Sequence, residues 1–247
     1  MDSSVIRVFV GFDQREAAAY HIFCQSVIER ASRPVAFLPI HGPMIGGFDG
    51  QRNGTNAFIF SRYLVPALCN YEGWALFFDG DMICNADVAE LSDYAKTYAD
   101  KAVAVVQHDY KTKNPRKYVG SKIENDNVDY PRKNWSSVVL WNCAHPANRR
   151  LDAAYVSGAS PAELHRFAWL NDADIGALPV EWNNLVGEYP PSAAKLDHYT
   201  LGVPGIRYYS DCNVSWRWHT ALLRALECAG ENPVRMVERA QDRIGEP

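Results

Sequence analysis

The sequence predicts an α/β fold with a largely parallel sheet. Short apolar or β-branched runs alternate with segments of helical apolar spacing through the first half of the 247-residue chain, as in strand–helix–strand units. Hydrophobic residues make up 47% and charged residues 22% of the chain, the composition of a globular protein that can bury a full core. In such folds, functional sites lie at the carboxyl ends of the strands.

The clearest strand is Trp74–Phe78, an uninterrupted apolar run that indicates burial on both faces of the sheet. The first strand is rich in β-branched residues and ends near Gly11. Strands are predicted at residues 5–12, 35–40, 74–78, 103–107 and 137–141. These strands supply the sheet, and the segments between them supply helices that cover it.

Helices are predicted from apolar spacing and from capping residues. Asp87 and Glu90 form a capping box that begins one helix, and Ser160 begins another. The predicted helices cover residues 16–30, 58–68, 87–98, 160–170 and 215–229. Gly230 is expected to end the last of these, and Asn232-Pro233 to begin a final one.

Two connections have the composition of loops. Residues 41–56 contain five glycines and a proline. We expect a flexible connection there rather than a phosphate-binding loop, because no Lys-Ser/Thr ending follows. Residues 108–134 form a long polar excursion with seven Lys or Arg and four Asp or Glu. We interpret this excursion as a solvated loop, with a lid over a bound ligand as the alternative.

The composition also excludes several classes of protein. The net charge is −4, from 25 Lys and Arg against 29 Asp and Glu, so no basic surface coats nucleic acid. The longest apolar runs have five residues, whereas a membrane-spanning helix needs about 20. No secretory signal is visible, and the six cysteines are scattered without a Cys-x-x-Cys pair. We expect a cytoplasmic protein, with at most a peripheral contact at the inner face of the membrane.

The most informative motif is Asp79-Gly80-Asp81, which directly follows the apolar strand. Residues two apart on an extended chain point the same way, so both carboxylates can face one point beyond the strand end. Two carboxylates this close repel each other unless a cation lies between them, and their oxygens suit Mg²⁺ or Mn²⁺. Gly80 leaves room for a ligand to approach the backbone. The alternative is an ordinary Asp-Gly turn.

Two more residues are candidates for the same site. His198 precedes Gly202 and Gly205, and backbone amides in glycine turns can receive a diphosphate. Taken alone, a single histidine is more often a structural or surface residue. Arg62, on the helix before the apolar strand, is either a fixed cation for a diphosphate or sugar, or a salt-bridged surface residue.

In this order and spacing, the motifs resemble glycosyltransferase family 8, the retaining group that includes glycogenin and bacterial lipopolysaccharide galactosyltransferases. The resemblance runs from residue 5 to about residue 218 and rests on VFVGFDQRE, SRYLVP, WALFFDGDMI, RKNWSSVVLWNC, WLNDADIGALPVEWN and HYTLGVPG. It implies one GT-A domain over residues 1–247, with a Rossmann-like nucleotide-binding sheet fused to a smaller acceptor-side sheet and helices on both faces. The nucleotide-binding half would be residues 1–107, the donor and acceptor half 108–214, and the C-terminal helices 215–247.

The resemblance implies transfer of a hexosyl group from a UDP-sugar to a glycan, lipid-linked or protein acceptor, with Mn²⁺ or Mg²⁺ as the metal. Asp79 and Asp81 would hold the metal, with His198 as the third protein ligand. Imidazole beside oxygen ligands favours Mn²⁺. Arg62 would contact the diphosphate or the donor sugar during catalysis, and Gly202 would give its amide to a phosphate.

The resemblance also places residues around the rest of the donor. Val10, Gly11 and Asp13, at the end of the first strand, would hold the uracil and the ribose. Trp135 and Ser136 occupy the place of the family's Asn-Ala-Gly strand, and would lie under the donor sugar.

The chain departs from the family pattern at two points that bear on catalysis. Asp172 or Asp174 would lie near the reacting carbon, but Ala173 stands where the family's Asp-Gln-Asp has its Gln. No lysine follows His198 in the family's place, so the cation on the leaving diphosphate would have to come from Lys133 or Arg207, or be absent.

Several mechanisms and functions remain open from the sequence. Retention of configuration at the anomeric carbon is compatible with two routes. One is a double displacement through Asp172 or Asp174, and the other is a front-face attack in which the departing phosphate oxygen takes the acceptor's proton. A catalytically degenerate module that binds a nucleotide-sugar or glycan is the main alternative to an enzyme. A sugar-1-phosphate nucleotidyltransferase is a further one, although the glycine-rich basic loop expected after its first strand is missing.

Overall fold

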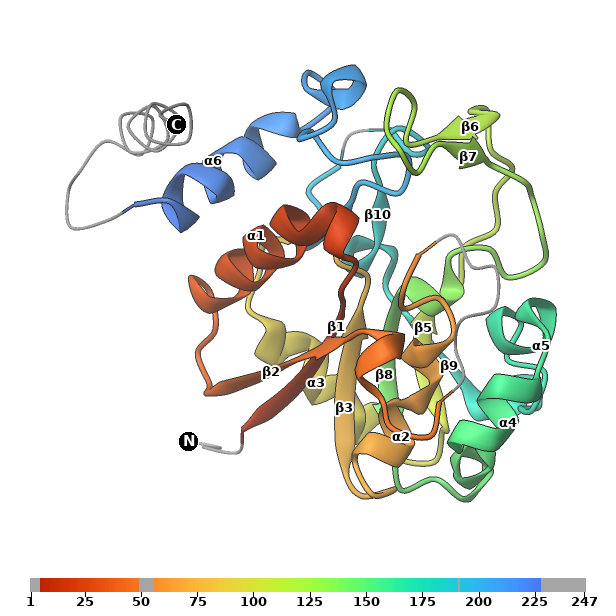
Figure 1. The fold of residues 1–247 in the computed structure, drawn as a ribbon. Helices are drawn as coiled ribbons and strands as arrows, with labels where there is room; N and C mark the ends of the chain where they lie inside the picture. Colours follow the sequence, from red (N-terminus) through yellow and green to blue (C-terminus); the bar gives the residue numbers. More distant parts are fainter. Residues whose placement is uncertain (1–4, 49–55, 191, 228–247) are drawn as a thin grey trace, which may run out of the picture.

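The computed structural model describes residues 5–48, 56–190 and 192–227. It is a mixed α/β fold on a six-stranded sheet in the order β2-β1-β3-β8-β5-β9 (Figure 1). β8 is antiparallel to both of its neighbours and the other strands run in one direction, so the predicted largely parallel sheet is confirmed. The strands are β1 Ile6–Gly11, β2 Val35–Ile40, β3 Trp74–Phe78, β5 Val103–Val106, β8 Val138–Asn142 and β9 Ile175–Leu178.

Helices cover both faces of this sheet because its central strands are apolar on both sides. Val8 and Leu76 pack into a core that includes Phe23 of α1. Phe9 and Phe77, one residue further along their strands, pack into the opposite core. The helices are α1 Ala17–Ile28, α2 Val65–Leu68, α3 Val88–Thr97, α4 Ala153–Gly158, α5 Pro161–His165 and α6 Ser215–Ala225. Helices α1 and α3 supply side chains to the first core, whereas α2, α4 and α5 supply them to the second.

The helix predictions are confirmed in position but not always in length. The predicted helix at 58–68 is a 3-10 turn, Ser61–Leu64, that continues into α2. The helix that begins after Ser160 has a capping box with Glu163 but ends at His165. Asp87 is the N-cap of α3, as predicted, and accepts from the Ala89 N–H at 2.9 Å. Gly230 and Asn232-Pro233, predicted to end one helix and begin another, lie outside the described residues.

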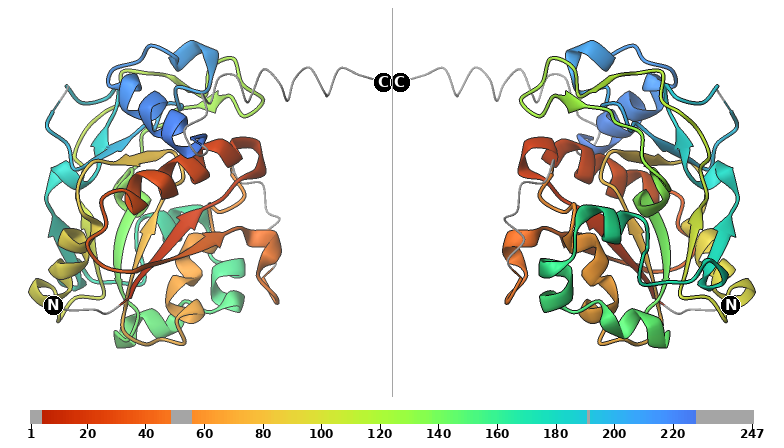
Figure 2. Two further views of the ribbon diagram at one scale, coloured as in Figure 1. Left: turned by 90° about the vertical axis from the view of Figure 1, so that its left-hand side faces the viewer. Right: turned by 90° about the vertical axis from the view of Figure 1, so that its right-hand side faces the viewer.

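A second, smaller sheet is connected directly to the first through the chain. β4 (Met82–Cys84) follows β3 after three residues and pairs antiparallel with β11 (Leu196–His198), which pairs with β10 (Asn184–Leu185). A separate hairpin is formed by β6 (Arg116–Lys117) and β7 (Asn125–Asp126). Helix α6 lies along α1, and Trp218 packs with Ile22 there (Figure 2).

The structure bears on two further expectations. None of the helices in the described part of the chain is long and apolar enough to cross a membrane. The described cysteines, Cys24, Cys69, Cys84, Cys143 and Cys212, are all free thiols. Cys228 lies outside the described residues.

The role of Gly80 differs from the one predicted. A Cβ at this position would lie 2.6 Å from the backbone oxygen of Gly11. The glycine therefore allows the ends of β1 and β3 to approach each other, and the space beside its Cα is filled by protein rather than left for a ligand. Close backbone approach of this kind is a common reason for glycine in a sheet.

We expect Gly80→Ala to lower the free energy of unfolding by about 1–3 kcal/mol, because the added methyl group must push two strand ends apart. Urea unfolding of the purified variant measures this loss. Gly158→Ala is the matched control, since a Cβ there meets nothing within 4 Å, and we expect a change below about 0.5 kcal/mol. Equal stability of the two variants would contradict this role for Gly80.

Candidate functional site

Asp79 and Asp81 lie at the carboxyl end of β3, where the main sheet passes into the smaller one. The Asp79 N–H donates to the Ser137 carbonyl, and the Asp81 carbonyl accepts from the Tyr199 N–H, both at 2.9 Å. Only 15% of the Asp79 side chain and 9% of the Asp81 side chain are exposed. Backbone hydrogen bonds to two other segments thus fix both carboxylates at one nearly buried point.

His198 joins this point because of strand register. β11 pairs with β4 so that His198 lies opposite Met82, and its Nε2 is 3.3 Å from Asp81 Oδ1. Ligand atoms of Asp79, Asp81 and His198 all lie within 4.8 Å of one another. The structure therefore brings together the three residues that the sequence analysis grouped as metal ligands.

The orientation of the His198 ring suits a metal ligand. Asn183 donates through its amide nitrogen to Ser137 Oγ at 2.8 Å, so its amide oxygen faces His198 Nδ1 at 3.0 Å. Nδ1 is then a hydrogen-bond donor to Asn183, and Nε2 is the nitrogen that faces Asp81. A ring held in this way by a second residue is typical of a metal-binding histidine. The donor set fits a divalent cation such as Mn²⁺.

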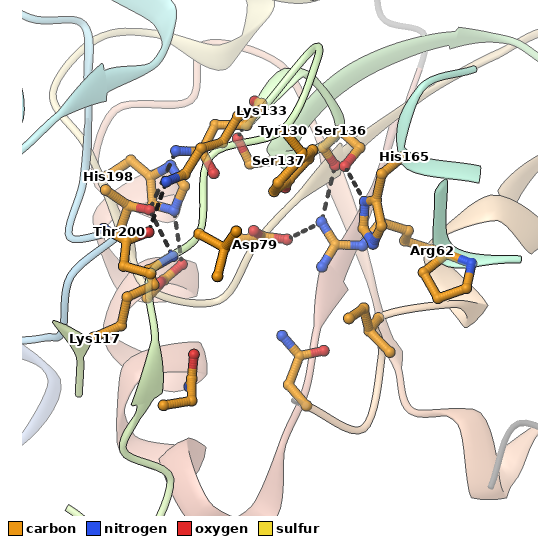
Figure 3. A pocket seen from close by; sticks show the side chains of 18 of the residues that line it. Arg62, Asp79, Lys117, Tyr130, Lys133, Ser136, Ser137, His165, His198 and Thr200 are labelled. Atoms are coloured by element: carbon orange, nitrogen blue, oxygen red, sulfur yellow. Dashed lines mark hydrogen bonds and ion pairs between the residues drawn. The ribbon is translucent and has the colours of Figure 1, made fainter. Parts of the chain in front are cut away.

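Arg62 balances the charge of Asp79. Its guanidinium Nη1 lies 2.6 Å from Asp79 Oδ1 and donates to the Ser136 carbonyl at 3.0 Å (Figure 3). The guanidinium carbon is 5.1 Å from the ring centroids of both Phe58 and Phe77. A side chain packed in this way has a fixed position, so Arg62 is a buried, preorganised cation rather than a surface salt-bridge residue.

The two carboxylates have different affinities for protons. Burial raises the pKa of Asp79 to about 6 against the effect of Arg62, and the charge of Asp81 adds to the rise. Burial acts on Asp81 in the same direction, but His198 and Lys117 outweigh it and lower the pKa of Asp81. Asp81 is therefore the carboxylate that stays charged in acid, and Asp79 is the one that gains a proton first.

A cavity of about 350 Å³ opens over this group. A volume of this size is typical of small-molecule sites. Of the sequence-predicted residues, the cavity is lined by Arg62, Asp79, Asp81, Ser136 and His198. Its other polar lining residues are Asn56, Lys117, Tyr118, Asn125, Asp126, Asn127, Tyr130, Lys133, Asn134, Ser137, His165, Arg166 and Thr200.

The residues expected to hold the nucleoside lie beside this cavity. Gly11, Asp13 and Gly80 line a second space of about 20 Å³ that also touches Tyr118. Val10 is fully buried in the core, and does not line either space. A space of about 20 Å³ holds one water molecule, so it is too small for a nucleoside as the structure stands.

Two residues that were predicted to contact the nucleotide-sugar donor, Gly202 and Trp135, do not line the cavity. The Gly202 N–H donates to the Tyr199 carbonyl at 2.8 Å, so the amide predicted to bind phosphate is already used within a turn. Trp135 donates its indole N–H to the His108 carbonyl at 2.9 Å and is not a lining residue. Local hydrogen bonding thus gives Gly202 and Trp135 structural roles, and leaves Ser136 as the residue of its pair that faces the cavity.

Asp172 and Asp174 are not brought to the site either. Both belong to a 3-10 turn that directly precedes β9, and the Asp174 carbonyl accepts from Ala102 N–H at the start of β5. The turn is therefore at the amino-terminal edge of the parallel strands, opposite the edge that carries Asp79. Asp172 is 92% exposed and pairs with Arg132. Neither carboxylate is among the described lining residues of the cavity, and their place beside the reacting carbon stays a prediction.

Sequence reasoning missed most of the cavity wall, including Lys117, Tyr118 and His165. Lys117 and Tyr118 come from the excursion interpreted as a solvated loop, and that interpretation is wrong for both residues. His165 comes from α5, with Nδ1 2.8 Å from the Tyr63 hydroxyl and 2.9 Å from Ser136 Oγ. Burial lowers the pKa of His165 to about 3, so its ring is neutral. The interleaving of lysine with tyrosine in the excursion was the only available signal.

Lys133 and Arg207 were the two cations considered as replacements for the family's lysine, and of these Lys133 lines the cavity. Lys133 lines the cavity, where its ammonium donates to Asn127 Oδ1 at 2.7 Å and lies 3.3 Å from Asp129. Arg207 is exposed and is not a lining residue.

One curated relative is similar over most of the chain. Protein CDI of Arabidopsis thaliana is 40% identical over 225 residues, which cover 86% of this chain and 84% of that protein. No protein-family model matches the chain.

Solved structures of glycosyltransferases share the fold. The bifunctional glycosyltransferase WbbM superposes with a TM-score of 0.62 at 14% identity, over 98% of this chain and 52% of WbbM. This chain thus spans about half the length of that protein. The galactosyltransferase LgtC, solved with donor and acceptor sugar analogues, gives a TM-score of 0.57 at 12% identity over 91% of this chain and 98% of LgtC. These likenesses confirm the predicted GT-A fold, and with it the resemblance to family 8 at the level of fold.

We expect the affinity for Mn²⁺ to fall about tenfold for each pH unit below about 6. The raised pKa of Asp79 is the reason, because the metal must displace a proton that this carboxylate holds at higher pH than an ordinary aspartate. Affinity is therefore full above this pKa and is lost as the pH falls through it. Titration of Mn²⁺ followed by electron paramagnetic resonance measures the slope.

Two variants control this measurement. Asp79→Asn should bind Mn²⁺ more weakly at every pH and with a shallower pH dependence, since its side chain has no proton to displace. Asp81→Asn should lose binding altogether. Retention of wild-type affinity by Asp81→Asn would show that the metal binds elsewhere.

Proposed function

Because this chain belongs to the same family as Protein CDI and has the GT-A glycosyltransferase fold, we propose that it is a retaining, Mn²⁺-dependent glycosyltransferase. It moves a hexosyl group from a UDP-sugar to a glycan, lipid-linked or protein acceptor. The observation that carries this proposal is the Asp79, Asp81 and His198 group at the wall of a 350 Å³ cavity. Such a group fits a nucleotide-sugar donor because a diphosphate is bound through a shared divalent cation.

The leaving diphosphate sets the main chemical demand on the site. Negative charge grows on the phosphate oxygen when its bond to the sugar breaks, and positive groups fixed near that oxygen lower the barrier. A divalent cation on Asp79, Asp81 and His198 would supply Lewis acidity toward the diphosphate. Arg62 adds positive potential from a position fixed by Phe58 and Phe77.

The charged groups of the cavity favour the front-face route. Its described lining has three carboxylates, of which Asp79 and Asp81 form the metal group and Asp126 pairs with Arg116 at 2.6 Å. None is free to act as a nucleophile on the sugar. In the front-face route the bond from the anomeric carbon to the phosphate oxygen breaks, and its electron pair stays on that oxygen. The acceptor hydroxyl bonds to the same face of the carbon and passes its proton to the departing oxygen.

The wall of the cavity offers hydrogen bonds that suit a sugar. Ser136 and His165 lie together beside Arg62, and Asn127, Tyr130 and Asn134 contribute amide and hydroxyl groups. Neutral polar groups of this kind bind sugar hydroxyls without competing for the metal.

Release of UDP from a panel of UDP-sugars in the presence of Mn²⁺ tests the proposal. We expect one donor to be hydrolysed or transferred by the wild type, and Asp81→Asn to lose at least about 100-fold in rate. Asp100→Asn is the matched control, because Asp100 is exposed and pairs only with its neighbour Lys101 among the described residues. Its rate should equal that of the wild type.

Other outcomes would select the alternatives. Mn²⁺-dependent UDP binding without turnover of any donor would favour a binding module. Release of pyrophosphate from UTP and a sugar phosphate would favour a nucleotidyltransferase. Absence of uridine nucleotide binding under every metal would contradict the proposed function itself.

A further inference from the structure

Lys117 brings the β6–β7 hairpin to the metal group. Its ammonium donates to Thr200 Oγ1 at 3.0 Å, and Thr200 lies two residues beyond the metal ligand His198. The next residue, Tyr118, donates its backbone N–H to the Leu201 carbonyl at 2.6 Å. The hairpin is therefore hydrogen-bonded to the segment that follows His198, and the side chain of Lys117 lines the cavity there (Figure 3).

The ammonium of Lys117 has unused capacity for an anion. It has three N–H donors, and its hydrogen-bond acceptor within the described residues is the neutral hydroxyl of Thr200. Two other cations of the cavity wall have partners, since Arg62 binds Asp79 and Lys133 binds Asn127 and Asp129. No ion pair of Lys117 is found in the part of the chain that the structure describes, so its charge is available to a ligand.

The position of Lys117 answers a question that the sequence left open. The chain has no lysine after His198 at the place expected from the resemblance, and the Gly202 amide there is used within a turn. Positive charge reaches the segment after His198 from another part of the chain, because the Lys117 ammonium donates to Thr200. Lys133 is less available to an anion, because its ammonium donates to Asn127 and pairs with Asp129.

We propose that Lys117 contacts the leaving diphosphate of the donor and is a catalytic residue of the transfer. This proposal rests on the proposed function, since it requires a nucleoside diphosphate in the cavity. When the sugar–oxygen bond breaks, the electron pair remains on the β-phosphate oxygen, and the fixed ammonium of Lys117 stabilises that charge. The ammonium keeps its proton, and the proton of the acceptor hydroxyl goes to the departing oxygen as described above.

The test compares Lys117→Met with the wild type in binding of UDP and of uridine, with Mn²⁺ present. We expect UDP affinity to fall about 30-fold, uridine affinity to stay within about twofold, and kcat for the accepted UDP-sugar to fall about 100-fold. Methionine keeps the length of the side chain and removes its charge. Because Lys117 also lowers the pKa of Asp81, the readout is the ratio of UDP affinity to uridine affinity rather than the melting temperature. A lysine with a purely structural role would affect both ligands alike.

Matched variants make each outcome decisive. Lys122→Met, at an exposed position in the turn of the same hairpin, should match the wild type in every measurement. Lys117→Arg keeps the charge and should retain more UDP affinity than Lys117→Met, which protects the test if one variant folds poorly. Unchanged UDP affinity in Lys117→Met, with normal Mn²⁺-dependent binding by the wild type, would overturn the role of Lys117 alone. A wild type that binds no UDP with Mn²⁺ would overturn the proposed function, and the role of Lys117 with it.

Discussion

The charge of two nearly buried carboxylates is the constraint around which this structure is arranged. Asp79 and Asp81 leave β3 at the carboxyl edge of the sheet with little access to water, so each needs compensation from a different part of the chain. Arg62 reaches Asp79 from the turn before α2, and His198 reaches Asp81 from the smaller sheet. The two sheets are thereby joined at the point where the metal would bind. Loss of one partner leaves a buried charge, which costs more than the pair contributes.

The same constraint explains why the protein carries groups that are unfavourable without a ligand. The raised pKa of Asp79 and the close approach of His198 Nε2 to Asp81 both describe a site that gains stability when a divalent cation enters. Lys117 is another charged group that burial disfavours. Burial lowers the pKa of its ammonium, although Asp81 opposes the change. With a divalent cation on Asp79, Asp81 and His198, the ammonium of Lys117 would add to a positive potential that suits a diphosphate.

The sequence predicted the features that depend on local order and missed those that depend on long-range contacts. An apolar run followed by Asp79 and Asp81 places both carboxylates at a strand end, whatever the rest of the fold. The roles of Gly202 and Trp135 depended on hydrogen bonds to Tyr199 and His108, which motif position does not specify. Asp172 and Asp174 are outside the described cavity lining because β9 begins directly after their turn. Lys117 was missed because its approach to Thr200 joins segments 83 residues apart.

The most direct test of the metal-dependent nucleotide site is electron–nuclear double resonance of Mn²⁺ bound to the protein in the presence of UDP. Coordination by His198 and by the diphosphate would give hyperfine couplings to nitrogen and to phosphorus in the same spectrum. We expect both couplings in the wild type and neither in Asp81→Asn, where the metal is lost. A spectrum of hydrated Mn²⁺ without phosphorus coupling, in protein saturated with UDP, would contradict a shared metal and nucleotide site.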